Sequence, residues 1–265
     1  MSRRLVPDEL WALAEPLIPE HGVRPQGGGP ARVDDRAVFT AIVFVLTSGC
    51  AWRYLPPSFG VTVPTAHRRF TEWTKAGLWP RLHRVVLDEL GGRGMIDWSR
   101  AVCDGASVRA KKGGSMTGPN PVDRGKSGSK IHVLSDRAGL PLSVAVSAAN
   151  TNDSYALKPL VMAVPAIRSR RGPRRRKPGK LHADKAYDQV ELRRWVSGRG
   201  IKVRIARKGI ESSRKLGQHR WVIERSIAWL FGYHRLATRY DRYANHFCAF
   251  LTLAATLTCF KKITY

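Results

Sequence analysis

The sequence predicts an α/β protein in which helices flank a mixed β-sheet, preceded by a small all-helical module. Residues 1–92 show helical apolar periodicity broken by Gly- and Pro-rich segments. From residue 93 onward, short strand-like runs alternate with helical ones. A chain of 265 residues with 43% hydrophobic content can bury a substantial core. We therefore divide the chain into a helical module, residues 1–92, and an α/β domain, residues 93–265.

The helical module is predicted to contain helices at residues 8–18, 34–48, 64–76 and 79–90. In the third helix, Ala66, Phe70 and Trp73 recur at helical spacing and should face the core, which leaves Arg68 and Arg69 pointing outward. Two interpretations of this outward face stay open. It can read the major groove, as in helix-turn-helix proteins, or it can be a plain solvated surface.

The second segment begins with strand-like runs at residues 99–110, 130–136 and 140–149. The elements predicted after them are a helix at 153–164, a strand at 180–184, a helix at 188–198, a strand at 201–206 and helices at about 219–230 and up to 262. This order is that of a ribonuclease-H-like fold. The apolar run at 247–260 is shorter than the roughly 20 residues that a bilayer requires, so we assign it to a core helix.

The net charge of +26 is concentrated in the second segment. Residues 1–92 hold 11 Lys and Arg against 9 Asp and Glu, whereas residues 93–265 hold 35 against 11. Such a field attracts a polyanion. The basic residues are spread over loops and strands rather than along one amphipathic helix, which favours nucleic acid over a membrane surface. The basic run at residues 168–180 either clamps DNA or orders only on the duplex.

The remaining global features indicate an intracellular protein. The four cysteines form no CxxC pair and have no His at zinc-finger spacing, and the N-terminal residues do not resemble a signal peptide. We expect a cytoplasmic protein with no membrane partner and no small-molecule substrate. The tryptophans assigned to the core rather than to base stacking are Trp52, Trp73, Trp79 and Trp98.

Most acids of the basic segment have a local role. Asp136 begins a hairpin turn, Asp153 stands at a helix start, and Asp188 with Glu191 has capping-box spacing. Others lie in polar, Gly/Pro- or Arg-rich surroundings where a solvated ion pair suffices, namely Asp97 in the linker, Asp123, Glu211 and Asp241. Three acids remain, and they are Asp104, Asp184 and Glu224.

These three acids stand where a metal site is expected. Asp104 follows the apolar run "AVC", Asp184 ends "KLHA", and Glu224 lies in "HRWVIERSIAWL". If the first and fourth strands are neighbours, the two aspartates meet at the strand ends, and a helix packed on the sheet can add the glutamate. Three converging carboxylates require neutralisation, which two Mg²⁺ or Mn²⁺ ions provide while they clamp a phosphoryl displacement.

A simpler interpretation exists for each acid. The two aspartates can merely end their strands in a turn, and Glu224 can pair with Arg220 one helical turn earlier. The helical wheel argues against a solvated Glu224, because it predicts a largely buried helix whose polar strip is Arg225 and Ser226. "RGKSGSK" has the ending of a phosphate-binding P-loop, but the earlier glycine is replaced by Asn120, so we reject that motif.

At these residues the sequence resembles a bacterial DDE transposase of the insertion sequence five family. The resemblance covers nearly the whole chain. The matching stretches are "ELWALAEPLIP", "RAVFTAIVFVLTSGCAWRYLPPSFG", "TAHRRFTEWTKAGLW", "DGASVRAKKGG", "DRGKSGSKIHVLSDRAGLPLSVAVSAANTND", "LHADKAYD", "RWVIERSIAWL" and "YHRLATRYDR". The 39 residues between Asp184 and Glu224 leave no room for the insertion domain of some relatives. Of the signature around Glu224, Arg220 is kept, but Gly217 and Phe231 replace its tyrosine and its basic residue, so Arg225 or Arg235 are candidate substitutes on DNA.

The resemblance implies that Asp104, Asp184 and Glu224 form a catalytic triad that holds two Mg²⁺ or Mn²⁺ ions, with Asp104 touching both. It implies hydrolysis of the phosphodiester at the element's inverted-repeat ends and attack of the freed 3′-hydroxyl on target DNA, by a homodimer or higher oligomer on double-stranded DNA. The candidate DNA contacts are Lys111, Lys112, Lys126, Lys130, Lys185, Arg220, Arg225, Arg68, Arg69, Arg174, Arg175 and Arg176. The alternatives are a non-catalytic or decayed DNA-binding protein and a nuclease without strand transfer.

Overall fold

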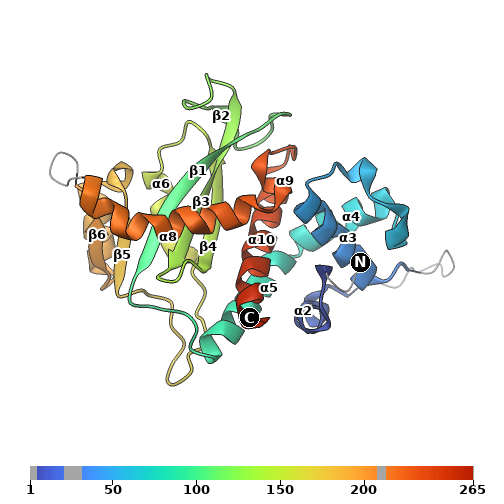
Figure 1. Cartoon of the computed structure of the whole chain (residues 1–265), viewed down its shortest axis with the longest axis horizontal. Coiled ribbons are helices and arrows are strands. Elements are labelled where there is room, and N and C mark those ends of the chain that lie inside the picture. Colours follow the sequence, from blue (N-terminus) through green and yellow to red (C-terminus); the bar gives the residue numbers. More distant parts are fainter. Residues whose placement is uncertain (1–4, 21–31, 208–212, 265) are drawn as a thin grey trace.

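A computed structural model describes residues 5–20, 32–207 and 213–264, with the side chains of 213–220 left out. A twisted sheet with its helices forms one part of the molecule, and a helical cluster forms the other (Figure 1). The long C-terminal helix α10, Ala244–Thr264, and helix α5, Leu78–Gly92, lie between these two parts (Figure 1). The chain therefore returns at its end to contact its own N-terminal helices.

The N-terminal cluster is helical, as predicted. It contains α2 (Asp8–Ala14), α3 (Asp35–Ser48), α4 (Val63–Lys75), α5 and the short 3₁₀ turns η1 (Glu15–Leu17), η2 (Trp52–Tyr54) and η3 (Pro57–Phe59). Helix α3 begins where Asp34 accepts a hydrogen bond from the Ala37 amide, and α4 begins where Thr62 accepts one from Thr65. Gly77, with φ of 71°, makes the tight turn between α4 and α5.

The sheet has the predicted ribonuclease-H-like arrangement. Its main strands are β1 (Ala101–Arg109), β3 (Ser127–Asp136), β4 (Pro141–Ala148), β5 (Lys180–Ala183) and β6 (Lys202–Ile205). Strand β3 is antiparallel to both β1 and β4, whereas β5 lies parallel to β1 and β6. The strands therefore run in the order β4-β3-β1-β5-β6, with the two-residue β2 (Gly118–Pro119) also paired to β3. Both parallel connections run through helices.

Helices cover both faces of this sheet. Helix α8, Ser213–Phe231, packs on β1 and β3 and crosses the front of the sheet in Figure 1. Helix α6, Ser154–Ala163, packs on the other face, where Ser143 of β4 donates a hydrogen bond to the Leu160 carbonyl at 2.8 Å. Helix α7, Val190–Gly198, packs against β6, and the four-residue α9, His234–Ala237, connects α8 to α10.

Helix α10 is a core helix, as predicted. It is the one described helix that is long and apolar enough to cross a membrane by length and composition, and 67% of its most apolar window is buried inside the protein. It packs on both β4 and α5. The rings of Phe70 in α4 and Phe250 in α10 stack with centroids 4.4 Å apart, so the apolar core runs from the helical cluster into the α/β part. That residues 1–92 and 93–265 act as separate domains stays a prediction.

Three local predictions are wrong because ion pairs decide where these side chains lie. Arg69 is only 5% exposed, although its position in α4 predicted an outward side chain, because it forms an ion pair with Asp35 of α3 at 3.1 Å. The expected capping box at Asp188 and Glu191 does not form, since α7 begins after Gln189 and the two acids bind Arg193 and Lys158. Asp241 is buried rather than solvated, and it pairs with Arg235 at 2.9 Å.

Other sequence predictions are confirmed. Ala66, Phe70 and Trp73 are all fully buried on one face of α4. Trp79 and Trp98 are also buried, and Trp52 is half-buried against the core. Gly125 is followed by strand β3 rather than by a helix, which agrees with the rejection of a P-loop.

Candidate active site

The pairing of β1 with β5 brings Asp104 and Asp184 to neighbouring positions. Cys103 of β1 stands opposite Ala183 of β5 in a parallel register, so the two aspartates occupy the next pair of positions. Neighbouring strands are about 5 Å apart, and residues at equal register in parallel strands point to the same face. The two carboxylates therefore project side by side at the end of the β1–β5 pair, and both residues are half-buried.

A hydrogen bond to the nearby backbone helps to orient each aspartate. One oxygen of Asp104 accepts the amide of Gly105 at 2.8 Å. One oxygen of Asp184 accepts the amide of Ala186 at 2.7 Å, because Asp184 is the N-cap of the 3₁₀ turn η4, Lys185–Tyr187. The simpler interpretation of a residue that ends a strand in a turn is therefore correct for Asp184 as a local description, but it is wrong for Asp104, because β1 continues to Arg109. Such a cap uses one carboxylate oxygen and also holds the side chain in place.

The two aspartates also act together on a buried thiol beneath them. Burial raises the pKa of Cys103 above its usual range, and the negative charges of Asp104 and Asp184 add to this effect. Burial likewise raises the pKa of Tyr187, which lies beside Cys103. Asp153, on the opposite face of the sheet, raises the pKa of Cys103 as well, so this thiol lies among three carboxylates.

Glu224 lies on the solvent-exposed face of α8, which contradicts the predicted burial of this face. Trp221, one turn earlier, is 52% exposed, and Glu224 is exposed with it. Part of the predicted polar strip of α8 faces the protein interior. Ser226 is fully buried and donates a hydrogen bond to the Gly139 carbonyl at 2.7 Å. The side of α8 that packs inward carries Val222, Ile223, Ile227 and Leu230.

The β3–β4 hairpin explains this orientation of α8. Its turn presents the carbonyl groups of Ala138 and Gly139 to the helix, and both receive side-chain hydrogen bonds from it. Arg225 donates to Ala138 at 2.7 Å, and its guanidinium lies 4.6 Å from the ring centroid of Trp221 and 4.7 Å from that of Trp229. Arg225 thus fixes the rotation of α8, which sets where Glu224 projects. Its predicted contact with DNA stays a prediction, and the pairing of Glu224 with Arg220 lies outside the described side chains.

The chemistry of these acids fits divalent ions of the Mg²⁺ type, because carboxylate oxygens are the ligands that such ions prefer. Among the residues that the structure describes, no group of three or more His, Cys, Asp or Glu side chains is placed to hold one ion. Two ions about 3.5–4 Å apart would share these carboxylates, so Glu224 would have to lie close to the two aspartates when the ions are bound. The neighbouring Asp104 and Asp184 suit one shared ion, and Glu224 lies on the helix that packs against β1.

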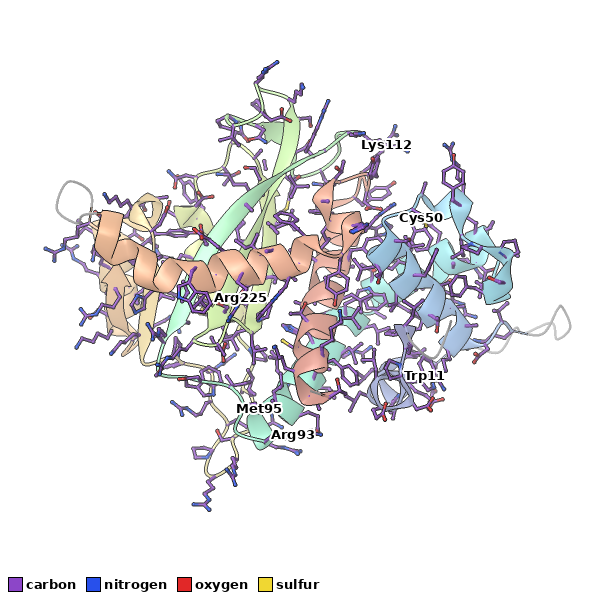
Figure 2. All side chains as sticks on the ribbon, in the orientation of Figure 1. Trp11, Cys50, Arg93, Met95, Lys112 and Arg225 are labelled. Atoms are coloured by element: carbon purple, nitrogen blue, oxygen red, sulfur yellow. The ribbon has the colours of Figure 1, made fainter. Side chains whose placement is uncertain are left out.

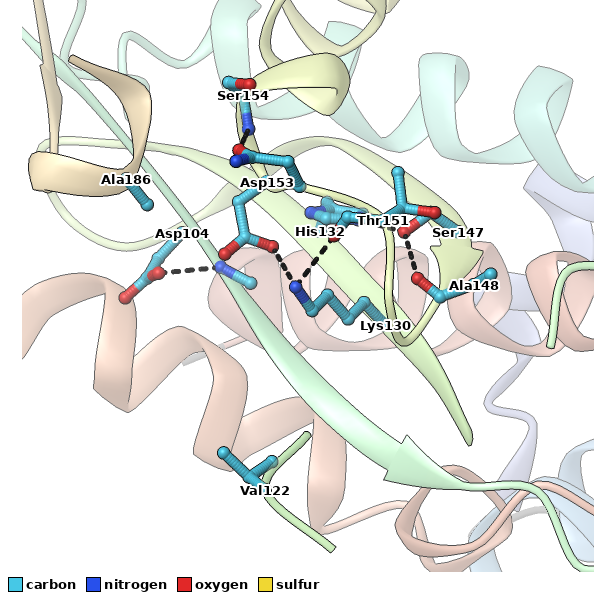
Figure 3. A network of polar contacts seen from close by, with 12 residues as sticks. Asp104, Val122, Lys130, His132, Ser147, Ala148, Thr151, Asp153, Ser154 and Ala186 are labelled. Atoms are coloured by element: carbon cyan, nitrogen blue, oxygen red, sulfur yellow. Dashed lines mark hydrogen bonds and ion pairs between the residues drawn. The ribbon is translucent and has the colours of Figure 1, made fainter. Parts of the chain in front are cut away.

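Lys130 and Asp153 form an ion pair on the opposite face of the sheet. Lys130 stands opposite Ser107 of β1, which by strand alternation points away from the face of Asp104. Its ammonium lies 2.9 Å from Asp153 and donates to the Thr151 carbonyl at 2.9 Å (Figure 3). The structure therefore gives the predicted phosphate contact of Lys130 no support. Asp153 precedes α6 but makes no side-chain cap there, since the neighbouring Asn152 accepts the Ser154 amide instead.

Gly105, which follows Asp104, is in close contact with a buried histidine. A β-carbon at this position would lie 2.9 Å from Nδ1 of His132 and 3.1 Å from the Ile131 carbonyl oxygen. The other ring nitrogen of His132 lies 2.8 Å from the Ser147 hydroxyl, and burial lowers the pKa of His132 to about 4. A side chain at position 105 would therefore force the His132 ring or the Ile131 carbonyl to shift, a constraint that the sequence did not reveal.

Several predicted DNA contacts are on the surface, although no contact with DNA is tested. Lys111 and Lys112 follow β1 and are exposed, Lys126 is near Asp123 at 3.9 Å, and Lys185 follows Asp184 directly. Arg68 is exposed on α4. The side chain of Arg220 lies outside the described residues.

The basic run at 168–180 is tied to its surroundings. Arg174 forms an ion pair with Asp88 of α5 at 2.8 Å, and Arg175 lies 5.6 Å from the ring centroid of Trp98. Arg176 donates to the Val164 carbonyl at 3.3 Å. Arg235, a candidate substitute on DNA, is excluded from that role because it is buried against Asp241.

Family models match most of the chain. Residues 96–259 match the model described as "Transposase DDE domain", and residues 6–83 match "Putative transposase of IS4/5 family". A "Putative transposase for insertion sequence element IS402" of Burkholderia cepacia is 42% identical over 151 residues, which are 57% of this chain and 72% of that protein. The "Insertion element IS402 uncharacterized 16.2 kDa protein" of the same organism is 41% identical over 123 residues, 46% of this chain and 84% of that protein.

Solved structures give a weaker likeness. A piggyBac transposase synaptic complex with hairpin DNA covers 79% of this chain and 50% of its own, with 11% identity and a TM-score of 0.39. A Mos1 transposase paired-end complex covers 91% and 82%, with 12% identity and a TM-score of 0.26. Both TM-scores are low, so these two structures do not establish a family for this chain. The family models and the IS402 relative decide the matter, and the chain belongs to the DDE transposases of the IS4/5 family.

Proposed function

We propose that this transposase binds the inverted-repeat ends of an insertion sequence, hydrolyses the phosphodiester at each end and joins the freed 3′-hydroxyl to target DNA. The observation that supports this most strongly is the register of β1 and β5, which sets Asp104 beside Asp184 at the end of the strand pair. Glu224 projects from the exposed face of α8, the helix that packs on β1. In this proposal, the three carboxylates are the metal-binding and catalytic groups.

Two reactions follow in sequence. In the first, water attacks the phosphorus in line, the bond from phosphorus to the 3′ oxygen breaks, and that oxygen leaves as a 3′-hydroxyl. In the second, this hydroxyl attacks a target phosphate and displaces another 3′ oxygen. Two Mg²⁺ or Mn²⁺ ions would neutralise the carboxylates and stabilise the attacking and leaving oxygens. The backbone hydrogen bonds of Asp104 and Asp184 hold these side chains in position, which lowers the cost of assembling the site.

The positive charge of the chain supports DNA as its partner. The segment that carries the three acids has an excess of basic residues, and such a field attracts duplex DNA strongly at low salt. Lys185, directly after Asp184, and the exposed Lys111 and Lys112, after β1, are the candidates for holding phosphates. Pairing two ends requires at least two protomers on the DNA, and the bacterial nucleoid is the expected place of action.

The test uses Asp184→Asn and a matched control, Asp123→Asn, which changes an acid near Lys126 in the loop before β3. We expect Asp184→Asn to bind end DNA as the wild type does but to cut none of it in Mg²⁺, and Asp123→Asn to cut normally. Retained cutting by Asp184→Asn, with binding unchanged, would exclude the carboxylate site.

The same assay separates the remaining candidates. Incubating precut ends with a labelled target plasmid and resolving joined products on a gel distinguishes a transposase from a nuclease that only cuts. A wild-type chain that binds ends but neither cuts nor joins them would indicate a non-catalytic or decayed copy.

A further inference from the structure

We propose that a cavity at the junction of the helical cluster and the C-terminal segment binds an unpaired nucleotide of a DNA strand. The cavity has a volume of about 930 Å³ and is lined by residues 49–54, by His67 and Lys112, and by residues of 235–246. Volumes of about 300 to 1,000 Å³ are typical of sites for small molecules and cofactors. Figure 2 labels two of its lining residues, Cys50 in the helical cluster and Lys112 beyond the end of β1. We call it the aromatic pocket, and the inference rests on the proposed action on DNA.

Aromatic rings form much of its lining. Tyr54 is 63% exposed, Tyr240 is 37% exposed and Tyr243 is 67% exposed, while Trp52 is half-buried. Large exposed rings gathered in one cavity are unusual, because such side chains normally bury their faces against the core. Nucleic-acid bases stack on aromatic rings of this kind, at about 1 to 3 kcal/mol per base.

The rings are surrounded by positive charge. Arg53, Lys112 and Arg242 line the cavity and are exposed. Lys111, one residue before Lys112, lies 5.6 Å from the ring centroid of Tyr240. Among the described residues of the lining, the acid is Asp241, which is buried and neutralised by its ion pair with Arg235. A cationic ligand would meet no exposed acid among the described lining residues, whereas a phosphate meets several cations.

The two walls of the aromatic pocket are fixed to each other before any ligand arrives. Arg235, only 4% exposed, binds Asp241 at 2.9 Å on the C-terminal side and the Cys50 carbonyl at 3.0 Å on the helical side. Gly49, with φ of 71°, approaches the other wall so closely that a β-carbon there would lie 2.8 Å from Cβ of His234. A preformed cavity of this kind loses little free energy to ordering when it binds.

The ligand is an unpaired nucleotide because only such a nucleotide exposes the face of its base. In a duplex, neighbouring base pairs cover both faces, and flipping a base out costs a few kcal/mol. The position agrees with a strand that leaves the active site. Strand β1 runs from Asp104 to its end at Arg109, which at about 3.4 Å per residue is roughly 17 Å, or about five base-pair rises, and Lys112 lies in the turn that follows.

The experiment measures binding of a fluorescein-labelled oligothymidine in EDTA, by anisotropy, to the full chain. The test variant is Tyr54→Ala/Tyr243→Ala, and the control is Tyr155→Ala, which changes a tyrosine that is 73% exposed on α6. We expect the double variant to raise the Kd at least tenfold and the control to leave it unchanged. A second comparison removes one positive charge at a time. Lys112→Gln, in the aromatic pocket, should raise the Kd by less than the double variant does, and Lys202→Gln of β6 should leave the Kd unchanged.

Several results would overturn the proposal. An unchanged Kd for the double variant, with a wild-type melting curve, excludes base stacking in the aromatic pocket. The surface binds protein instead if the double variant leaves the Kd for oligothymidine unchanged but alters a protein interaction. That interaction is read either as the oligomeric state in sedimentation or as the affinity for an acidic peptide. Asp104→Asn separates this inference from the catalytic proposal, because it should abolish cutting and leave oligothymidine binding intact.

Discussion

Two regions, one within strand β1 and one just beyond its end, expose different kinds of side chain. At Asp104 the sheet presents carboxylates, each held by a short hydrogen bond to a nearby amide. Beyond the end of the same strand, at Lys111 and Lys112, the surface presents cations and aromatic rings, and its one acid is buried in an ion pair. The first region suits chemistry on a phosphate and the second suits holding a strand.

This contrast shows that charge alone does not identify a site in so basic a chain. The arrangement of acids on neighbouring strands marks the first region, and exposed aromatic rings among cations mark the second. The two regions also share a scaffold, because Arg239 is fully buried and donates to Ser129 of β3 and to the carbonyl groups of Met116 and Asp241. The following predictions test whether the regions can be separated.

The largest effect should come from Asp104→Asn. Removing this charge should lower the rate of end cleavage by on the order of ten-thousandfold, equivalent to about 5 kcal/mol of transition-state stabilisation. Single-turnover cleavage of a labelled end measures it, and anisotropy with oligothymidine checks the other region. A variant that loses both functions equally would contradict the separation of the two regions.

Asp241→Asn should destabilise the scaffold of the aromatic pocket. It leaves the buried Arg235 without a compensating charge, and breaking a buried pair in this way costs about 3 to 5 kcal/mol. Urea unfolding followed by tryptophan fluorescence measures this loss. The double variant Arg235→Met/Asp241→Leu serves as its control and should recover much of the stability. An Asp241→Asn chain as stable as the wild type would show that the pair contributes little.

Gly105→Ala should disturb β1 next to Asp104 and so impair the carboxylate site. The new methyl group lies 2.9 Å from Nδ1 of His132, and overpacking of this kind costs about 1 to 3 kcal/mol. We expect a lower melting temperature and slower end cleavage, measured by scanning calorimetry and the cleavage assay. Gly198→Ala, at a position where a β-carbon meets nothing within 4 Å, is the matched control. Equal behaviour of the two variants would mean that His132 moves freely.

The smallest effect concerns pH and the contact between the helical cluster and the sheet. His83 of α5 is buried, its Nε2 lies 3.0 Å from the Pro141 carbonyl, and burial lowers its pKa from 6.5 to about 4. The unfolded chain therefore binds this proton more readily, so stability should fall as the pH drops from about 6.5 toward 4, by about 1 to 2 kcal/mol at pH 5.

Comparing the wild type with His83→Gln isolates this contribution. Asp136 opposes it, because burial raises its pKa to about 6, and the folded state then gains stability as the pH falls through that value. The two chains share Asp136, so the difference between their urea-unfolding curves at pH 7 and pH 5 reports on His83. Parallel pH dependence of the two chains would show that His83 does not titrate in this way.

The sequence predicted the strands, most helices and the positions of Asp104 and Asp184, because these depend on local periodicity and on the pairing of β1 with β5. Elements too short for a periodic pattern were missed, among them the two-residue β2, the four-residue α9 and the 3₁₀ turns η2, η3 and η4. The catalytic role of the three acids stays a prediction.

The errors arose where a partner distant in sequence decides the outcome. A helical wheel gives the faces of α8 but not which one meets the sheet, and the carbonyl groups of the β3–β4 turn draw Ser226 inward and leave Glu224 outside. Arg69 is buried because it forms an ion pair with Asp35 of another helix. Lys130 of β3 likewise forms an ion pair with Asp153, which precedes α6. The adjacent Asn152 was a local signal that Asp153 was not needed as a cap.

The central claim is that Asp104, Asp184 and Glu224 surround one binding place for divalent ions. Replacing Mg²⁺ by Fe²⁺ in the presence of ascorbate and end DNA generates hydroxyl radicals at that place, and mass spectrometry locates the cuts they make in the protein backbone. We expect cuts near residues 104, 184 and 224 together, suppressed by excess Mg²⁺ and absent in Asp104→Asn. Cuts that avoid any one of these three segments in the wild type would contradict the claim.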